Sequence, residues 1–502
     1  MEVSLKVVDD DDDVREEVEE KEGWCVGFWR RYLCEGQKLD RRLQDEVESG
    51  RVSVRYRKII AVLIPFTIVH AVWWTCFIKY KSFHKFVNYS GKKERWIDKG
   101  LLGKEDTAPW YMSVTMIFGS MVAGMTSEGG ASVAFPVMTL IFDIKPVVAK
   151  HFSFMIQSVG MTAAAFVIVF MRVQIEWKSV VYCTIGGVAG VIYGLEEVSP
   201  ELTPPYAKMY FVVIWGSFAA SLFFLNRIYG RKVYVVLDPP HLPNIWRSAD
   251  LVANRWLALV LNWKALILIA AGFLGGIFTS IAGSGIDICS FSVLTLLFRI
   301  SEKTATPTSV VLMAINTVVA MCYSKWGMRE GLEGLAWEFF VVCAPIVVVG
   351  APLGSVIGSY VHRLVLAAFI YITDTVQLAG ALYVVRPWTH TKCHKRGGKN
   401  GPDCEPVHLC WSSAVIFVAG LITFYVLQFV GERLIQRNSR IELEAEEKPP
   451  WSDDGWAGVE ADDAKDDHRR LGGGGVDADL VLLPLPPASS SNTDDDKGPG
   501  AF

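Results

Sequence analysis

The sequence predicts an all-α polytopic membrane protein built from two homologous halves. Half of the 502 residues are hydrophobic, the mean hydropathy is +0.30, and charge is concentrated in the chain ends and in short stretches between apolar runs. A soluble domain would interleave charged and apolar residues at helical or strand spacing along its whole length. The net charge of −4 and this distribution also exclude a nucleic-acid-binding protein.

The first apolar segment is expected to remain in the mature chain. The residues before it include the all-aspartate run 9–13, the reverse of the basic start of a cleaved secretory signal. The segment covers residues 59–78, close to the roughly 20 residues that cross about 30 Å of hydrocarbon. It therefore predicts a membrane span.

Eleven further apolar segments follow, and two of them are too short to cross unaided. These two begin at Ala131 and Ile286 and hold about 12 residues, well below the length of a span. Each follows a glycine-containing break, residues 127–130 and 283–285. Broken or re-entrant helices are therefore predicted at two places. The full set is 59–78, 110–126, 131–142, 152–172, 180–195, 206–225, 265–282, 286–298, 308–323, 337–360, 364–385 and 412–430.

The two breaks occupy equivalent positions of an internal repeat. When the chain is aligned with itself at an offset of 156, ten of the 35 positions from Gly119 to Ser153 are identical. Self-similarity at a fixed offset indicates duplication. The identical pairs are Gly119 and Gly275, Gly129 and Gly285, Phe135 and Phe291, Val137 and Val293, Thr139 and Thr295, Leu140 and Leu296, Phe142 and Phe298, Ile144 and Ile300, Ala149 and Ala305, and Ser153 and Ser309.

The duplicated segments are GSMVAGMTSEGGASVAFPVMTLIF, starting at Gly119, and GGIFTSIAGSGIDICSFSVLTLLF, starting at Gly275. They resemble the duplicated glycine-rich motif of the TauE/SafE family, often called sulfite exporters, and the resemblance covers roughly residues 109–386. It implies export of small sulfur-containing anions such as sulfite, sulfoacetate or related organosulfonates. The two copies differ before and after their shared glycine, which bears on the transported species more than on the fold.

Physical chemistry independently gives the breaks a transport role. Paired glycine-interrupted segments at membrane depth indicate a substrate site, because non-helical backbone is tolerated there only against protein or a water-filled cavity. Helices beginning at Ala131 and Ile286 would present amide groups and a partial positive charge to an anion. Small residues beside them would let the anion approach the backbone. The predicted substrate-binding residues are Ser127, Gly129, Gly130, Ala131, Gly283, Ser284, Gly285 and Ile286.

The alternative interpretation is that such glycines only permit close helix packing. For the Gly190-x-x-x-Gly194 and Gly350-x-x-x-Gly354 pairs, packing is the preferred interpretation. For the paired breaks the substrate site is preferred, because a packing seam would not require a short second segment.

Three acidic residues inside apolar runs are predicted to couple transport to an ion. They are Glu128, Asp287 and Asp374, and buried charges in membranes are costly enough to indicate a function. A carboxylate would repel an anionic substrate, so binding of a proton or cation is expected. A helix–helix hydrogen bond is the alternative for Asp374. Lys150 and Lys303 could attract anions or extend to the membrane interface.

The number of crossings leaves two topologies open. If each broken pair crosses twice, a half has five crossings and the halves are inverted, which is the preferred interpretation. If each pair crosses once, a half has four crossings and the halves are parallel. Either count places both termini on one side, and Arg433, Arg437 and Arg440 after the last span suggest the cytosol.

The predicted organisation is a cytosolic acidic and amphipathic region at 1–57, a first span at 58–79, a basic loop at 80–108, repeats at 109–226 and 264–386 joined by a linker at 227–263, a Cys/His-containing loop at 387–410, a last span at 411–430 and a disordered acidic tail at 431–502. In the Cys/His-containing loop, Cys393, Cys404 and Cys410 suggest a disulfide, with a metal site or unpaired thiols as alternatives.

Three classes of function remain after the sequence is considered. A secondary transporter explains the duplication and the breaks without a nucleotide-binding motif; a small-anion channel and a non-transporting scaffold or receptor are the alternatives. The expected partners are a small anion, the lipid bilayer and a coupling proton or cation. No cofactor is expected, and no predicted span carries an HExxH or GxSxG motif of an intramembrane enzyme.

Overall fold

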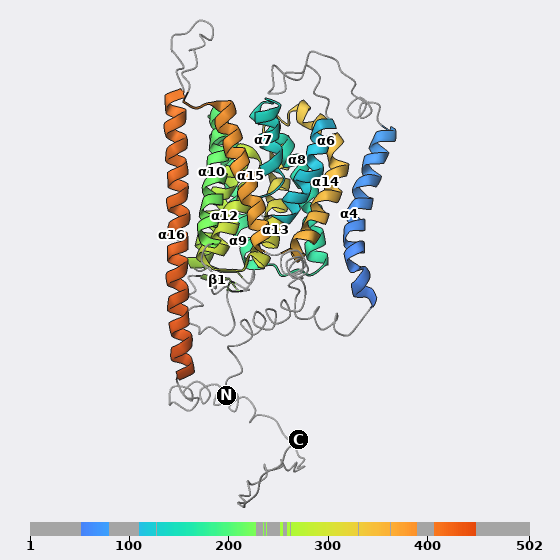
Figure 1. Ribbon diagram of the computed structural model, residues 1–502. Coiled ribbons are helices and arrows are strands. Elements are labelled where there is room, and N and C mark those ends of the chain that lie inside the picture. The colour runs from blue at the N-terminus through green and yellow to red at the C-terminus, as the bar shows by residue number, and fades with distance from the viewer. Residues whose placement is uncertain are drawn as a thin grey trace, which may run out of the picture. The chain divides into compact units, whose positions relative to one another are not determined.

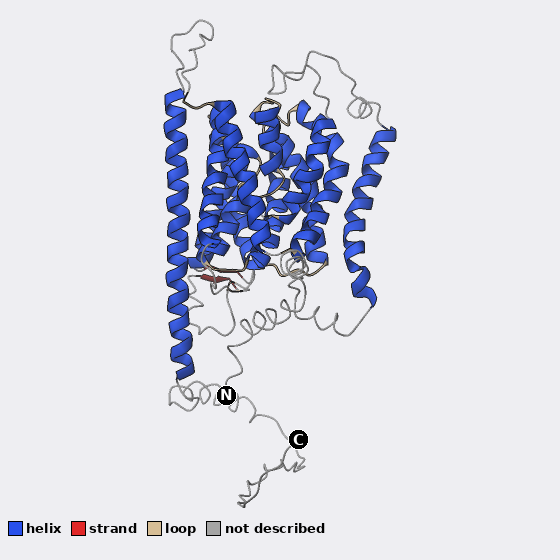
Figure 2. Ribbon diagram, viewed as in Figure 1, coloured by secondary structure: helices blue, strands red, loops and turns tan. Residues whose placement is uncertain are grey.

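A computed structural model describes residues 52–79, 110–126, 128–226, 234, 237, 252–254, 259–261, 263–329, 331–361, 363–388 and 406–447. These residues are almost all helical (Figure 2). Two short antiparallel strands, β1 (Val252–Asn254) and β2 (Leu259–Leu261), are the exception. By its contacts the chain divides into residues 1–441 and 442–502, and of the second unit only the last residues of one helix are described.

All twelve predicted apolar segments are helices. Nine helices among the described residues are long and apolar enough to cross a membrane, and three apolar helical segments are shorter. The helices are α4 (Val52–Lys79), α6 (Trp110–Met125), α7 (Ala131–Pro136), α8 (Pro146–Phe170), α9 (Trp177–Tyr193), α10 (Pro204–Asn226), α11 (Trp263–Ala282), α12 (Ile286–Ser292), α13 (Glu302–Cys322), α14 (Gly334–Tyr360), α15 (Arg363–Val385) and α16 (Pro406–Glu447), with π-helical turns η1 (Val137–Ile141), η2 (Gly194–Val198), η3 (Val293–Leu297) and η4 (Tyr323–Gly327).

The end of α16 differs from the sequence prediction. The tail was expected to be disordered from residue 431, but α16 continues as a helix to Glu447. Arg433, Arg437 and Arg440 therefore lie on a helix that extends the last span.

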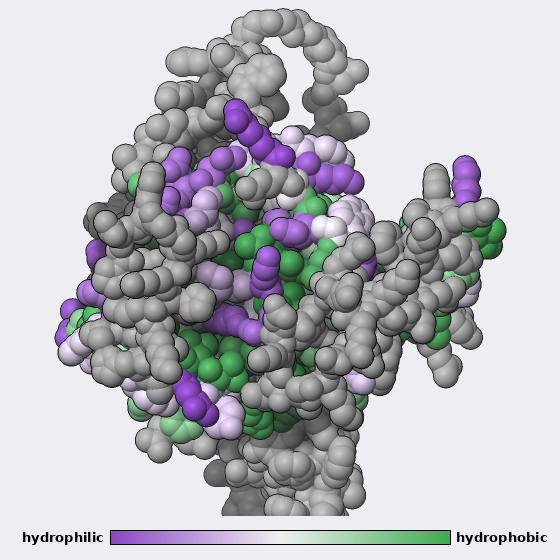
Figure 3. Space-filling view, turned by 90° about the horizontal axis from the view of Figure 1, so that it is seen from above, coloured by the Kyte–Doolittle hydropathy of each residue, from purple (hydrophilic) through white to green (hydrophobic). Residues whose placement is uncertain are grey.

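The helices bury polar side chains and expose apolar ones, the arrangement expected of a bundle in lipid. Ile78 on α4 and Trp411 on α16 are 77% and 71% exposed, whereas Glu128, Asp287 and Asp374 are fully buried. Only lipid tails would cover such apolar outer faces without cost. The upper end in Figure 1, seen from above in Figure 3, carries hydrophilic as well as hydrophobic residues, as expected where a bundle meets water.

Each short segment folds back on the helix before it. The rings of Tyr111, near the start of α6, and Phe142, after η1, have centroids 6.3 Å apart. Those of Trp263, at the start of α11, and Phe298, after η3, are 5.8 Å apart. The pairs α6 with α7–η1 and α11 with α12–η3 are therefore re-entrant hairpins, named hairpin 1 and hairpin 2 below.

The hairpins bear on the crossing count, which the sequence leaves open. By length and composition, the candidate spans include α8, α9 and α10 in the first half and α11, α13, α14 and α15 in the second, whereas α6 and the segments α7–η1 and α12–η3 are shorter. The number of crossings in each half therefore stays a prediction. Figure 1 shows α7 of hairpin 1 in the upper part of the bundle and α12 of hairpin 2 in the lower part.

The helix α8 and its equivalent in the second half, α13, run in opposite directions. His151, at the start of α8, accepts from the amide of Glu333, which precedes α14, at 3.2 Å. Arg57, near the start of α4, donates to the carbonyl of Phe170, at the end of α8, at 2.8 Å. α8 therefore runs downward in Figure 1, while α13 runs upward beside it.

The same local structure recurs 156 residues apart. The turns η1 and η3 begin at the equivalent residues Val137 and Val293. The residues that follow each turn, Asp143 and Arg299, both have positive φ, 51° and 54°. Such a conformation is uncommon for residues other than glycine, so its occurrence at both places reflects the same chain reversal before α8 and α13.

Glycines bring the helices of one half against those of the other. A Cβ atom added to Gly190 on α9 would overlap the carbonyl of Phe273 on α11, and one on Gly354 of α14 would overlap the carbonyl of Met121 on α6. The packing interpretation of the Gly190-x-x-x-Gly194 and Gly350-x-x-x-Gly354 pairs is confirmed.

Replacing Gly354 by leucine is expected to lower the stability of the protein. The side chain would push apart the backbones of α14 and α6, and overpacking of this kind costs about 1–3 kcal/mol or more. Gly380→Leu on α15 is the control, since a Cβ there meets nothing within 4 Å. Thermal unfolding of the two purified variants in detergent checks the prediction, and equal melting temperatures would contradict it.

Candidate functional site

The tips of the two hairpins meet inside the bundle. The hydroxyl group of Ser284, in the break of hairpin 2, lies 3.1 Å from the carbonyl oxygen of Glu128, in the break of hairpin 1. Gln157 of α8 lies beside this contact and donates from Nε2 to the carbonyl of Gly283 at 2.7 Å. Two breaks that lie far apart in the sequence thus form one buried polar region.

Only glycine fits the sharpest bend in each tip. Gly129 and Gly283 have φ of 73° and 95°, in the region that L side chains rarely adopt. A Cβ on Gly129 would meet Met313 and Gln157, and one on Gly283 would meet Ser153 of α8. Both tips are therefore held tightly against α8 and α13.

Glu128 and Asp374 form a buried carboxyl pair. Glu128 follows α6 and Asp374 lies on α15, and both carboxyl groups are buried close enough to influence each other. By distance and angle, neither oxygen of Asp374 accepts a hydrogen bond from a donor group of the described residues. Thr373 also donates weakly to Glu128 Oε2, at 3.4 Å. Two carboxyl groups can share a hydrogen bond only when one carries a proton. The geometry therefore makes a site that can hold a proton between hairpin 1 and α15.

Asp287 has different partners. Its carboxyl group lies within hydrogen-bonding reach of the Ser284 hydroxyl, which has one hydrogen for both Asp287 and the Glu128 carbonyl. The amides of Gly285 and Ile288 point toward the same carboxylate. By distance and angle, Oδ1 completes no hydrogen bond. Asp287 thus sits over the first turn of its own helix, near enough to influence the Glu128 carboxyl but not paired with it.

The two short helices begin differently. The amide of Ile286, at the start of α12, donates to the hydroxyl of Thr279 at 3.1 Å, and Asp287 faces the next amides. Gly130, before α7, supplies no side-chain cap, and Ala131 follows it fully buried. The start of α7 is therefore the more open of the two toward an anion.

The two lysines lie away from the tips. Lys150 Nζ donates to the hydroxyl of Ser199 at 2.6 Å, toward the upper end of the bundle. Lys303 lines a cavity on the lower side. No group of three or more His, Cys, Asp or Glu side chains in the described part of the chain could hold a metal ion.

Sequence analysis did not identify Gln157 and Asn316. Both are fully or nearly fully buried, and their side-chain carbonyl oxygens, Oε1 and Oδ1, accept no hydrogen bond. Gln157 Oε1 lies against Gly129, and Asn316 Oδ1 against Gly187 of α9. The rule that polar residues inside apolar runs are functional, applied to amides as well as acids, would have found them.

Several predicted residues lie outside the described part of the chain. These are Ser127 of the first break and Cys393 and Cys404 of the Cys/His-containing loop. Cys410 is described, exposed at the start of α16.

Together, the apolar helices and the paired re-entrant hairpins define an all-α integral membrane protein that crosses the bilayer several times. The chain belongs to the sulfite exporter TauE/SafE family, whose sequence profile matches residues 112–376, slightly more than half of its length. The match runs from α6 into α15 and so includes both hairpins. This is a family of membrane transporters of sulfur anions rather than of enzymes. No match was found among curated proteins or among solved structures.

Proposed function

We propose that the protein is a secondary transporter that exports small sulfur oxyanions, sulfite or organosulfonates, by alternating access around the two hairpin tips. The observation that carries the proposal is the direct contact between the tips, through Ser284 and Glu128. Interrupted helices that meet at membrane depth are the usual location of a transporter's substrate site.

The substrate is proposed to bind between the start of α7 and the tip of hairpin 2. The uncapped start of α7, next to Gly129 and Gly130, supplies amides without side chains in the way. Ser284 and Gln157 border the same region and can donate hydrogen bonds once their present contacts open. Repeats 109–226 and 264–386 are proposed to be inverted. Movement of one repeat against the other would then expose the substrate site between the tips first to one side of the membrane and then to the other.

A proton is the proposed coupling ion, and the Glu128–Asp374 pair is its binding site. An anion cannot enter next to two charged carboxylates without strong repulsion, whereas a neutral, protonated pair would admit it. The contact between the two carboxyls, one on a hairpin tip and one on a crossing helix, supports this choice over a cation. Asp287 is proposed to stabilise the tip of hairpin 2 through Ser284 and so affect coupling indirectly.

Both termini are proposed to face the cytosol. In Figure 1, α4 begins at the lower side of the bundle and α16 runs from the upper side toward the lower side. Arg433, Arg437 and Arg440 belong to the C-terminal part of α16, and basic residues concentrate on the cytosolic side of membranes.

Reconstitution of the purified protein in liposomes tests the proposal. Uptake of sulfite, sulfate, sulfoacetate, taurine and chloride is measured with and without a pH gradient. We expect saturable flux of sulfite or a sulfonate that responds to the gradient. Large unitary currents without saturation would instead identify a channel, and no flux of any anion would leave only a scaffold or receptor.

A further inference from the structure

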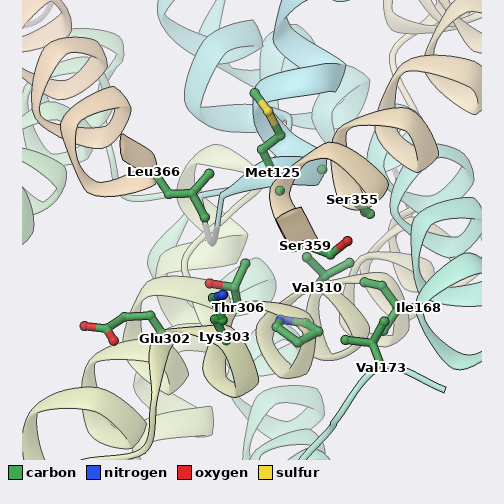
Figure 4. A pocket seen from close by; sticks show the side chains of 13 residues that line it. Met125, Ile168, Val173, Glu302, Lys303, Thr306, Val310, Ser355, Ser359 and Leu366 are labelled. Atoms are coloured by element: carbon green, nitrogen blue, oxygen red, sulfur yellow. The ribbon is translucent and has the colours of Figure 1, made fainter. Parts of the chain in front are cut away.

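A cavity of about 40 Å³ lies between the end of α6, which leads into the break of hairpin 1, and the start of α13. Residues of α6, α8, α13, α14 and α15 line it (Figure 4). It has room for about three water molecules, comparable to one small oxyanion. The lining residues that matter for its chemistry are Met125, Lys303, Thr306, Val310, Ser355 and Ser359.

The cavity reaches the candidate site at its upper wall. Met125 is the last residue of α6, immediately before the break that holds Glu128. Val310 lies one helical turn before Met313 on α13. The sulfur atom of Met313 packs directly against Gly129 of the tip, so that a Cβ atom added to Gly129 would overlap it. Two wall residues of the cavity, Met125 and Val310, are therefore each three residues away from a residue of the tip region, Glu128 and Met313.

The other end of the cavity is formed by the first turns of α13, at the lower end of the bundle. Lys303 and Thr306 come from these turns, and Ser355 and Ser359 come from the last turns of α14. Glu302 also lines the cavity, but Figure 4 shows its carboxylate at the edge, pointing outward. The hydroxyls of Ser355 and Ser359 donate to carbonyls of α14, at 3.1 and 2.6 Å. Lys303 is the one cationic side chain among the described lining residues, and its ammonium group suits a small oxyanion better than a cation.

We infer that this cavity is the access chamber through which a small sulfur oxyanion reaches the hairpin tips from the lower side, and that Lys303 recruits it. The inference rests on the proposed transport function. It also favours anion attraction for Lys303 over simple extension to the membrane interface.

Transport kinetics of Lys303→Gln test the inference. In vesicles sorted by the accessibility of a C-terminal tag, sulfite is supplied from the lower side. We expect the half-saturating sulfite concentration to rise about tenfold with the maximal rate within about twofold of wild type. Lys303→Arg should restore most of the affinity, because the charge remains. Lys208→Gln, which removes a lysine paired with Asp143 at the upper end, is the charge-matched control and should behave as wild type.

Unchanged half-saturation in Lys303→Gln, or an equal rise in Lys208→Gln, would overturn the inference while leaving the transport function intact. Absence of flux in the wild type itself would instead count against the proposed function. The two failures are therefore distinguishable.

Cysteine accessibility tests the chamber without relying on flux. In a variant that keeps only the buried native cysteines, Cys183 and Cys343, Ser359→Cys should react with a membrane-impermeant thiol reagent added on the lower side only. Glu201→Cys, in the exposed loop before α10, should react from the upper side only. Reaction of Ser359→Cys from the upper side, or from neither side, would contradict an access chamber at this place.

Discussion

Replacing Glu128 by glutamine is expected to remove the response of sulfite flux to a pH gradient. The amide keeps the size of the side chain and its contact with Asp374, but it cannot bind and release a proton. Per coupled proton, a gradient of one pH unit changes the equilibrium accumulation of substrate about tenfold in the wild type, and this factor should fall to about one in the variant.

The measurement combines labelled sulfite uptake with a pH-sensitive dye trapped inside the liposomes. Glu196→Gln is the control, because it also replaces a carboxyl group by an amide, but at an exposed position outside both breaks. Glu196 accepts a hydrogen bond from the hydroxyl of Tyr323 at 2.8 Å. Proton movement that continues with sulfite uptake in Glu128→Gln would remove Glu128 from the coupling role and leave Asp287 or Asp374 to be tested.

Replacing Gly129 by alanine is expected to abolish transport. The alanine would hold a φ of 73°, a strain of about 1–3 kcal/mol, and its Cβ would in addition displace Met313 and Gln157 at the tip. The tip would then move away from hairpin 2, and the proposed binding region would lose its geometry. Flux in liposomes and thermal unfolding of the purified variant check the prediction.

The variant Gly331→Ala distinguishes the effect of backbone strain from the effect of close contacts at the tip of hairpin 1. Gly331 has a similar φ of 67°, but a Cβ there meets nothing within 4 Å. This control should lose a comparable amount of stability to backbone strain while keeping its flux. If Gly129→Ala transports sulfite as well as Gly331→Ala does, close packing of the tip is unnecessary for transport.

The helices could be predicted from the sequence because lipid imposes length and hydrophobicity on every crossing. The segments at 131–142 and 286–298 were found for the same reason, since both are too short to cross. The sequence predicted broken or re-entrant helices here without deciding between them, because Gly129 and Gly283 show where the chain bends and not that it reverses. The reversal depends on contacts between distant residues, such as that of Tyr111 with Phe142.

The candidate site was predicted residue by residue but not as pairs. The cost of burying charge identifies Glu128, Asp287 and Asp374 separately. It cannot show that Glu128 faces Asp374 while Asp287 faces Ser284, because α15 and hairpin 1 come together only in the folded bundle. Gln157 was missed because an uncharged amide within a mostly apolar helix gives a weaker signal than a charge.

A structure of the protein in lipid nanodiscs with selenite, a heavier analogue of sulfite, tests the central claim most directly. The account predicts selenium density inside the bundle, between Gly129 to Ala131 of hairpin 1 and Gly283 to Gly285 of hairpin 2. Continuous hairpins sealed against each other, with selenium found only on the outer surface, would contradict it.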